Sequence, residues 1–259
     1  MIGAIVGDVI GSPFESCNVK STAFRLFGQS AQCTDDSILT VATADALLND
    51  GDYCQAYHDY FHRFPNAGYG GRFVVWANRR EAEPYHSWGN GSAMRVSPVG
   101  WARDTFDDVM DEAERTARVT HDHPDGIVGA QAVAVCVFLA RTEHNRDRIR
   151  QFVHHGCQYP LDRTVDQIRP TYEFDASCRG TVPIAVQAFL ESTDFESAVR
   201  LAISVGGDSD TIACIAGAIA HAYYSSIPTH LFRPVVDTYL PDDLLDVTLR
   251  FCERYSVPL

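Results

Sequence analysis

The chain has 259 residues, of which 46% are hydrophobic and 21% are charged, so its composition is that of a folded protein with a sizeable core. The formal net charge of −13 argues against non-specific nucleic-acid binding and against docking on an anionic membrane. No run of about 18 uninterrupted apolar residues occurs, so we expect neither a transmembrane helix nor a membrane partner.

The predicted elements of the first half are helices separated by polar loops. An apolar stretch at residues 2–11 is interrupted by Asp8 and is followed by Gly11-Ser12-Pro13, which predicts that a buried helix ends there. A polar loop is expected at residues 16–33. Further helices are predicted at about 35–49, 53–63 and 72–80, and turn-rich loops at 65–71 and 84–92.

The second half continues in the same way. Residues 104–119 carry their apolar side chains at helical spacing, and the nearly all-apolar residues 125–142 predict a central helix. Asp194 and Asp208 have the position of N-caps, and Gly206 that of a helix stop. No strand-like alternation, repeat or linker occurs, so we predict an all-α fold with one domain over residues 1–259. The remaining helices are expected at about 145–156, 181–191, 195–205, 209–226 and 242–255.

The cysteines and the N-terminal stretch bear on the cellular compartment. The eight cysteines are scattered without a C-x-x-C pair, which excludes the usual zinc spacing and favours reduced core cysteines. The stretch MIGAIVGDVIGSPFE lacks a basic segment and carries an aspartate, so it is not typical of a signal peptide. Both features predict a cytoplasmic protein.

Two acidic strings stand at the start of apolar helical runs far apart in the sequence. They are Thr34-Asp35-Asp36 and Asp208-Ser209-Asp210-Thr211. Only one of two adjacent aspartates can cap a helix, so a further carboxylate is left for another role. If the two helix ends meet, they form an oxygen-only nest that selects Mg²⁺, Mn²⁺ or Ca²⁺. The alternative is that these acids only interact favourably with helix dipoles.

Two glycine-rich turns and a histidine pair are further candidates for a binding site. The turns are Gly68-Tyr69-Gly70-Gly71 and Trp88-Gly89-Asn90-Gly91-Ser92, in which glycine would let backbone amides approach an anion and an aromatic ring would stack on a base. Simple turn chemistry explains either turn equally well. Thr120-His121-Asp122-His123 precedes the central helix and favours an imidazole hydrogen bond to phosphate over zinc binding, while a structural turn explains it equally well.

Taken together, these segments resemble the ADP-ribosylglycohydrolases, a family of ADP-ribosyl-acceptor hydrolases. The resemblance runs nearly end to end, through G-D-V-I-G-S-P-F-E at residues 7–15, T-D-D, G-Y-G-G, G-N-G-S-A-M-R, T-H and finally G-G-D-S-D-T-I-A. The pairing of T-D-D near the start with D-x-D-T near the end is specific, whereas the glycine segments alone are not.

The resemblance implies an orthogonal helical bundle with functional loops around a cleft that holds two Mg²⁺ or Mn²⁺ ions. Glu15 matches the family's mobile acid beside the metals. By matching positions, the implied metal ligands are Thr34, Asp35, Asp36, Asp208, Asp210 and Thr211. The implied substrate-binding residues are Gly70, Gly71, Gly89, Asn90, Gly91, Ser92, His121 and Gly180.

The implied reaction is hydrolysis at the anomeric carbon of an ADP-ribosylated substrate, with ADP-ribose as a product. Glu15 is our candidate for handling the proton, and metal-bound Asp36 is its rival. Arginine, serine, a nucleobase and O-acetyl-ADP-ribose all remain possible sources of the linkage. The alternatives are a non-catalytic ADP-ribose-binding protein and a different magnesium-dependent hydrolase that acts on a nucleotide diphosphate.

Overall fold

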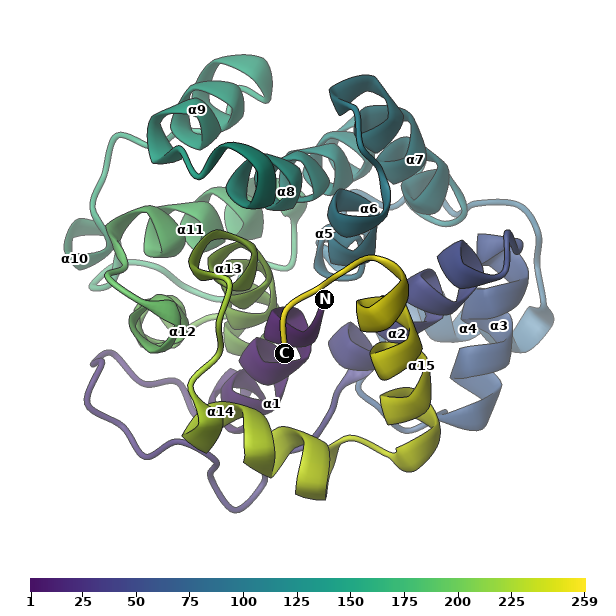
Figure 1. The fold of residues 1–259 in the computed structure, drawn as a ribbon, viewed down its shortest axis with the longest axis horizontal. Coiled ribbons are helices and arrows are strands. Elements are labelled where there is room, and N and C mark those ends of the chain that lie inside the picture. Colours follow the sequence, from purple (N-terminus) through teal and green to yellow (C-terminus); the bar gives the residue numbers. More distant parts are fainter.

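A computed structural model describes residues 1–259, and its regular elements are helices joined by loops (Figure 1). No strand is formed, and a single isolated antiparallel bridge joins Gly89 to Ser177. The predicted all-α fold is therefore confirmed. The helices are α1 (Ile2–Glu15), α2 (Asp35–Leu48), α3 (Tyr53–Arg63), α4 (Gly71–Arg79), α5 (Gly91–Met94), α6 (Ser97–Ala102), α7 (Phe106–Arg118), α8 (Pro124–Glu143), α9 (Arg146–Gln151), α10 (Val165–Ile168), α11 (Cys178–Glu191), α12 (Phe195–Ser204), α13 (Ser209–Tyr224), α14 (Thr229–Pro234) and α15 (Asp242–Arg254), with π-helical turns η1 (Phe152–Gly156) and η2 (Val235–Tyr239).

The centre of the fold is the antiparallel pair α1 and α13 (Figure 1). The two backbones are so close that only glycine fits at their contact. A Cβ on Gly7 would lie 2.1 Å from the carbonyl oxygen of Ala213, and one on Gly217 would lie 2.3 Å from the carbonyl oxygen of Gly3. Further along, a Cβ on Gly11 would lie 2.7 Å from the Cα of Asp210. This packing brings the C-terminal end of α1 to the N-terminal end of α13.

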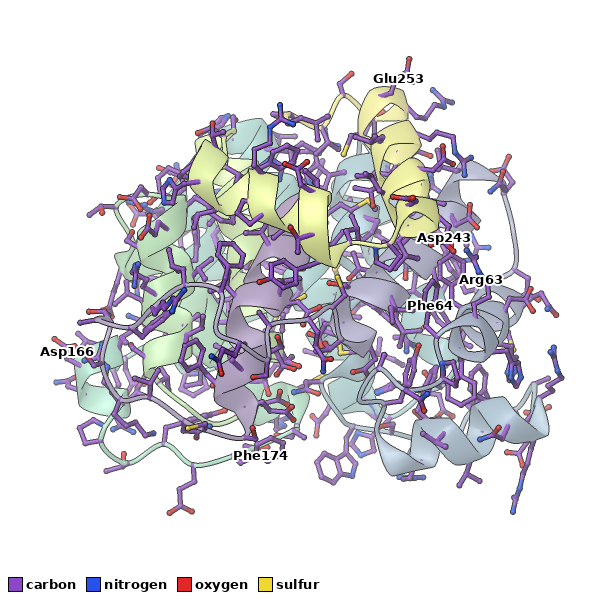
Figure 2. All side chains as sticks on the ribbon, turned by 90° about the horizontal axis from the view of Figure 1, so that it is seen from below. Arg63, Phe64, Asp166, Phe174, Asp243 and Glu253 are labelled. Carbon is purple, nitrogen blue, oxygen red and sulfur yellow. The ribbon has the colours of Figure 1, made fainter.

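Other helices surround this pair. Helix α8 packs against α7, α13, α6 and α5, while α2 packs against α3, α15 and α1. At the surface, Arg63 of α3 and Asp243 of α15 lie side by side and form an ion pair of 2.6 Å (Figure 2). Helix α8 is long and apolar enough to cross a membrane by length and composition, and 67% of that window is buried inside the fold. Packing within the fold therefore accounts for its apolar side chains.

The first helix is longer than its sequence suggests. We expected it to end near Pro13, because proline lacks the amide hydrogen that would bond the carbonyl of Val9. Instead, the Ser12 hydroxyl donates to that carbonyl at 3.1 Å, and α1 continues to Glu15. Because of these additional residues, the Glu15 carboxylate lies close to Asp208 and Asp210 at the N-terminal end of α13.

Several other boundaries also differ from the prediction. Helix α11 begins at Cys178 rather than near 181, because the Ser177 hydroxyl caps it by accepting from the amide of Gly180 at 2.9 Å. The predicted helix over 145–156 ends as a π-helical turn. The short helices α5, α6, α10 and α14 lacked a recognisable period in the sequence, since none exceeds 6 residues.

Candidate functional site

The structure brings together carboxylates from both ends of the sequence. Carboxylate oxygens of Asp8, Asp36 and Asp210 all lie within 4.8 Å of one another, and all three residues are buried. A second group within the same distance consists of Glu15, Asp208 and Asp210. We call these five residues the acidic cluster. They come from α1, α2, α13 and the residue just before α13.

The T-D-D string is held by the start of α2. Thr34 is the N-cap, and its hydroxyl accepts from the amide of Asp36 at 3.2 Å. Asp35 and Asp36 therefore both lie in the first helical turn, with neither carboxylate used as a cap. Asp36 faces the cluster, whereas half-buried Asp35 lines the neighbouring cleft.

The second acidic string is arranged differently. Asp208 has the predicted N-cap position of α13, yet its side chain makes no capping bond. Its carboxylate instead accepts a hydrogen bond of 2.7 Å from the side-chain amide of Asn90. The Thr211 hydroxyl reaches across to the Asp36 carboxylate at 3.3 Å, so the two strings are in direct contact.

Asp8 is the member of the cluster that the sequence analysis missed. Its carboxylate accepts from the amide of Thr34 at 3.0 Å, the Thr34 hydroxyl at 2.7 Å and the amide of Ser37 at 3.2 Å, and it also contacts the Ser37 hydroxyl. Burial nevertheless raises the pKa of Asp8 to about 6. The available signal was an aspartate inside an otherwise apolar helix, which we had interpreted only as an interruption.

The electrostatics of the acidic cluster favour a bound cation. Burial raises the pKa of Asp36 well above its usual range, and the carboxylates of Asp8, Asp35 and Asp208 raise it further. The pKa of Asp210 is raised for the same reasons, with Asp36 as the strongest charged neighbour. One oxygen of Asp36, Oδ1, is buried without any hydrogen-bond partner. The carboxylates of the cluster and the hydroxyls of Thr34 and Thr211 supply oxygen donors beside Asp36, and such a donor set fits Mg²⁺, Mn²⁺ or Ca²⁺.

Glu15 ends α1 at the exposed side of the cluster. Partial burial raises its pKa, as do the neighbouring carboxylates of Asp208 and Asp8. The Asn18 side chain holds this end of the helix in place. Its amide nitrogen donates to the carbonyls of Glu15 at 2.9 Å and Gly207 at 3.2 Å, while its oxygen accepts from the amide of Gly207 at 2.6 Å.

A cleft of about 290 Å³ lies beside Asp35 and Asn90. Most of the substrate-binding residues that the resemblance implied are in its wall, where four basic or aromatic side chains outside the implied set accompany them. The predicted residues in the wall are Asp35, Gly70, Gly71, Gly89, Asn90, Gly91 and His121, and the additional ones are Arg72, Phe73, Tyr85 and Arg95. The cleft wall therefore carries the positive charges of Arg72 and Arg95 as well as the carboxylate of Asp35.

Two of the predicted substrate-binding residues lie outside this wall. The buried Ser92 hydroxyl donates to the carbonyl of Gly126 at 2.7 Å, which fixes α5 against α8. Gly180 lines a second hollow of about 400 Å³ together with Tyr172 and Asp175. A Cβ on Gly180 would lie 2.1 Å from the Asp175 carboxylate, so close packing accounts for this glycine.

Fold and site together define an all-helical protein with a buried cluster of oxygen ligands at the side of a glycine-lined cleft. Comparison with known proteins identifies the family. The model of the ADP-ribosylglycohydrolase family matches residues 1–257, and the chain belongs to this family.

Individual relatives are distant in sequence but extend over most of the chain. ADP-ribosylhydrolase ARH3 of Homo sapiens is 28% identical over 86% of this chain and 84% of its own length. An uncharacterized protein of Archaeoglobus fulgidus is 25% identical over 94% of this chain and 92% of its own. A solved structure described as an ADP-ribosylglycohydrolase-related protein complex has the same fold, with a TM-score of 0.74 and 24% identity over 100% of this chain and 96% of the other.

Proposed function

We propose that this protein hydrolyses the bond between the anomeric carbon of ADP-ribose and an acceptor, and releases free ADP-ribose. The observation that carries the proposal is the buried cluster of Asp8, Asp36 and Asp210 at the side of the glycine-lined cleft. Family membership and the similarity to ADP-ribosylhydrolase ARH3 support the same reaction. With a net charge of −13, an anionic substrate needs metal ions, backbone amides or arginine side chains at its site to offset the overall field.

Divalent cations, which we propose to be two Mg²⁺ or Mn²⁺ ions, would be held by carboxylates of the acidic cluster with the hydroxyls of Thr34 and Thr211. When bound, these ions would orient the ribose hydroxyls and lower the pKa of a water molecule. Asp8 would not coordinate the ions itself, because four donors from Thr34 and Ser37 already surround its carboxylate. It would instead keep the residues that coordinate them in position. Its role would be to orient the T-D-D string.

Glu15 is the group we propose for proton transfer. It lies at the exposed edge of the cluster, where an acceptor leaving the anomeric carbon can reach it. Its raised pKa keeps it closer to the range in which a carboxyl both holds and releases a proton near neutral pH. The transition state would carry positive charge on the ribose ring, which the neighbouring Asp208 and Asp210 carboxylates favour electrostatically.

The cleft supplies the complementary binding surface. Gly89 and Gly91 leave its wall open to an anion, and His121 and Arg72 place donors on the same side. A diphosphate fits this lining better than a neutral sugar does, because Arg72 and Arg95 form no ion pair, although the Asp35 carboxylate lines the same cleft. This arrangement separates the anchoring of the nucleotide from the chemistry at the ribose.

A substrate panel tests the proposal directly. ADP-ribosylated arginine and serine peptides, an ADP-ribosylated nucleobase and O-acetyl-ADP-ribose are incubated with Mg²⁺ or Mn²⁺, and free ADP-ribose is measured by chromatography. We expect release from at least one substrate and its loss after exhaustive EDTA treatment. AMP as the product would instead indicate cleavage of the diphosphate, and tight binding without any release would indicate a non-catalytic ADP-ribose-binding protein.

The role of Glu15 is tested by Glu15→Gln. We expect turnover to fall by about 10² to 10³-fold, because the amide cannot take or give a proton, while the affinity for ADP-ribose is kept. The matched control is Glu253→Gln on α15 (Figure 2). Glu253 is an exposed acid that belongs neither to the acidic cluster nor to the cleft wall. Unchanged turnover of Glu15→Gln would remove this residue from proton transfer and leave Asp36 as the candidate.

A further inference from the structure

Arg95 is a fully buried cation that the proposed reaction does not use directly. It follows α5, is 0% exposed and forms no ion pair with a carboxylate. Its guanidinium lies 4.2 Å from the centre of the Tyr57 ring, and two of its nitrogens, Nε and Nη1, have no partner. An unpaired buried charge destabilises a fold, so its presence beside the cleft calls for a functional explanation.

The third nitrogen of Arg95 contacts the segment that carries His121. Nη2 donates to the carbonyl of Thr116 at 3.1 Å and to the Thr120 hydroxyl oxygen at 2.8 Å. The same Thr120 oxygen lies 2.7 Å from Nδ1 of His121. Arg95, Thr120 and His121 thus form a continuous chain of hydrogen bonds that ends at an imidazole in the cleft wall.

The order of donors in this chain follows from elementary chemistry. A guanidinium has only donors, so Thr120 accepts from Arg95. In the arrangement that we consider first, the single hydroxyl hydrogen of Thr120 is directed to Nδ1 of His121, which then accepts it. Burial and the charges of Arg95 and Arg72 lower the pKa of His121 well below its usual value, so the ring is neutral, and in this arrangement its hydrogen is on Nε2.

The protonated nitrogen lies beside the glycine turn. A Cβ on Gly91 would be 3.1 Å from Nε2 of His121, and one on Gly89 would be 3.7 Å from it. All three residues line the same cleft. A side chain at residue 91 would therefore crowd the nitrogen, and glycine keeps the space in front of it open to a ligand.

We propose that Arg95 is a positioning residue, which acts through Thr120 to fix His121 as the Nε2–H tautomer and so directs a neutral donor to a phosphate oxygen of the ligand. This inference rests on the proposed function, because ADP-ribose supplies the phosphate. A fixed tautomer presents a donor to the anion without a reorganisation step. Arg95 itself does not touch the ligand, since the two nitrogens left without a partner are buried.

One competing arrangement is defined by Tyr85, whose hydroxyl also lies beside Thr120. If the Thr120 hydrogen went to Tyr85, Nδ1 of His121 would carry the proton. Nε2 would then be unprotonated and would present a hydrogen-bond acceptor, instead of a donor, to the cleft. The state of His121 in the metal-free, ligand-free protein therefore decides between the two. It is read from the ¹⁵N chemical shifts of the ring nitrogens, with His121→Gln used to assign the signal.

We expect an unprotonated Nδ1 and a protonated Nε2 in the wild-type protein and in Tyr85→Phe. Thr120→Val removes the hydroxyl and should give a mixture of tautomers, whereas Thr120→Ser should restore the wild-type spectrum. Arg95→Met should release Thr120 to accept from His121 and so produce the Nδ1–H form. A wild-type ring protonated on Nδ1, or an unchanged spectrum in Thr120→Val, would overturn the proposal.

Binding and kinetics supply a readout that a merely structural role would not give. Thr120→Val should weaken the binding of ADP-ribose by about twofold, because only the Nε2–H part of an evenly mixed population offers the donor, and should raise KM by the same factor while leaving kcat unchanged within error. The matched control is Thr116→Val on α7, because the Thr116 hydroxyl donates to the carbonyl of Ala113 and only its backbone meets Arg95. Equal ADP-ribose affinity in Thr120→Val and wild type would contradict the proposal.

The two hypotheses fail in different ways. If the protein binds ADP-ribose but releases none from any substrate, the proposed reaction is wrong, while the tautomer and affinity measurements still test the positioning role. If substrates are hydrolysed and Thr120→Val matches the wild-type protein, the reaction stands and the positioning role is wrong.

Discussion

Three helices position the carboxylates of the acidic cluster, whereas loops between helices form most of the cleft wall. Asp8 and Asp210 belong to helices whose backbones touch, so their separation is set by a glycine contact in the core. The cleft residues at 70, 89 and 121 come from loops or helix starts. We infer that the metal-binding part tolerates few changes, while the part that contacts the rest of the substrate is free to vary.

The two regions also differ in their electrostatic cost. The cluster concentrates buried like charges, which raises the pKa values of Asp8, Asp36 and Asp210 and destabilises the fold when no cation is bound. The cleft wall instead carries basic side chains such as Arg72, with room for an anion. Folding and function are therefore opposed throughout the cluster, whereas in the cleft wall they are opposed only at buried Arg95.

The largest expected effect comes from Asp36→Asn, which breaks the cluster without changing its shape. We expect turnover to fall at least about 10³-fold, because a metal ligand is lost. The metal-free variant should nevertheless melt at a higher temperature than the metal-free wild type, since one buried charge is removed. Asp246→Asn at the surface of α15 serves as the control for both measurements. A lower melting temperature in metal-free Asp36→Asn would show that charge repulsion does not dominate there.

An intermediate effect is expected when the helix contact beneath the cluster is altered. Gly7→Ala places a Cβ 2.1 Å from a backbone oxygen of α13, so overpacking should lower the free energy of unfolding by about 2–3 kcal/mol. The matched control is Gly71→Ala, where a Cβ meets nothing within 4 Å. It starts α4 and should be neutral or stabilising by less than about 1 kcal/mol. Urea denaturation measures both, and equal destabilisation of the two variants would contradict the comparison.

The smallest expected effect is a pH dependence of the stabilisation by Mg²⁺. The pKa of Asp8, about 6, and the raised pKa values of Asp36 and Asp210 mean that the metal-free native state binds more protons than the unfolded chain. The free energy of unfolding without metal therefore falls as pH rises from about 4, the usual pKa of an aspartate, to about 6 and beyond. A bound cation replaces these protons.

The rise in melting temperature caused by Mg²⁺ should consequently grow with pH over that window. Buried His121 and His221 have lowered pKa values and act in the opposite direction, but they contribute equally with and without Mg²⁺ and cancel in the difference. Differential scanning calorimetry with paired samples makes the measurement. A shift that is constant with pH would argue against protonated carboxylates in the metal-free state.

Much of the fold was predictable because its signals are local. Helix α2 begins at Asp35 and ends at Leu48, close to the predicted 35–49, since Thr34 caps it and the turn Asn49-Asp50-Gly51-Asp52 follows. The acidic strings were visible for the same reason. Their meeting was not, because it depends on the contact of Gly7 with Ala213, two residues that lie 206 positions apart in the sequence. The resemblance to a family, rather than local pattern, supplied that step.

The remaining differences concern side chains whose partners are distant. Asp8 was missed because its partners Thr34 and Ser37 belong to another helix. Ser92 was grouped with the glycine turn, yet its hydroxyl meets a carbonyl of α8. The Arg95 chain of hydrogen bonds was equally hidden, since its three members acquire a role only when α5 packs near the end of α7.

The Ser12 hydroxyl does more than repair the helix at Pro13. While it donates to the carbonyl of Val9, its oxygen accepts from the amide of Gln32, just before Thr34. One small side chain thus joins the last turn of α1 to the segment that leads into the T-D-D string. Ser12 is therefore expected to persist in evolution even where residue 13 is not proline: an ordinary amide at 13 would satisfy Val9, but Gln32 would still need the Ser12 oxygen as its acceptor.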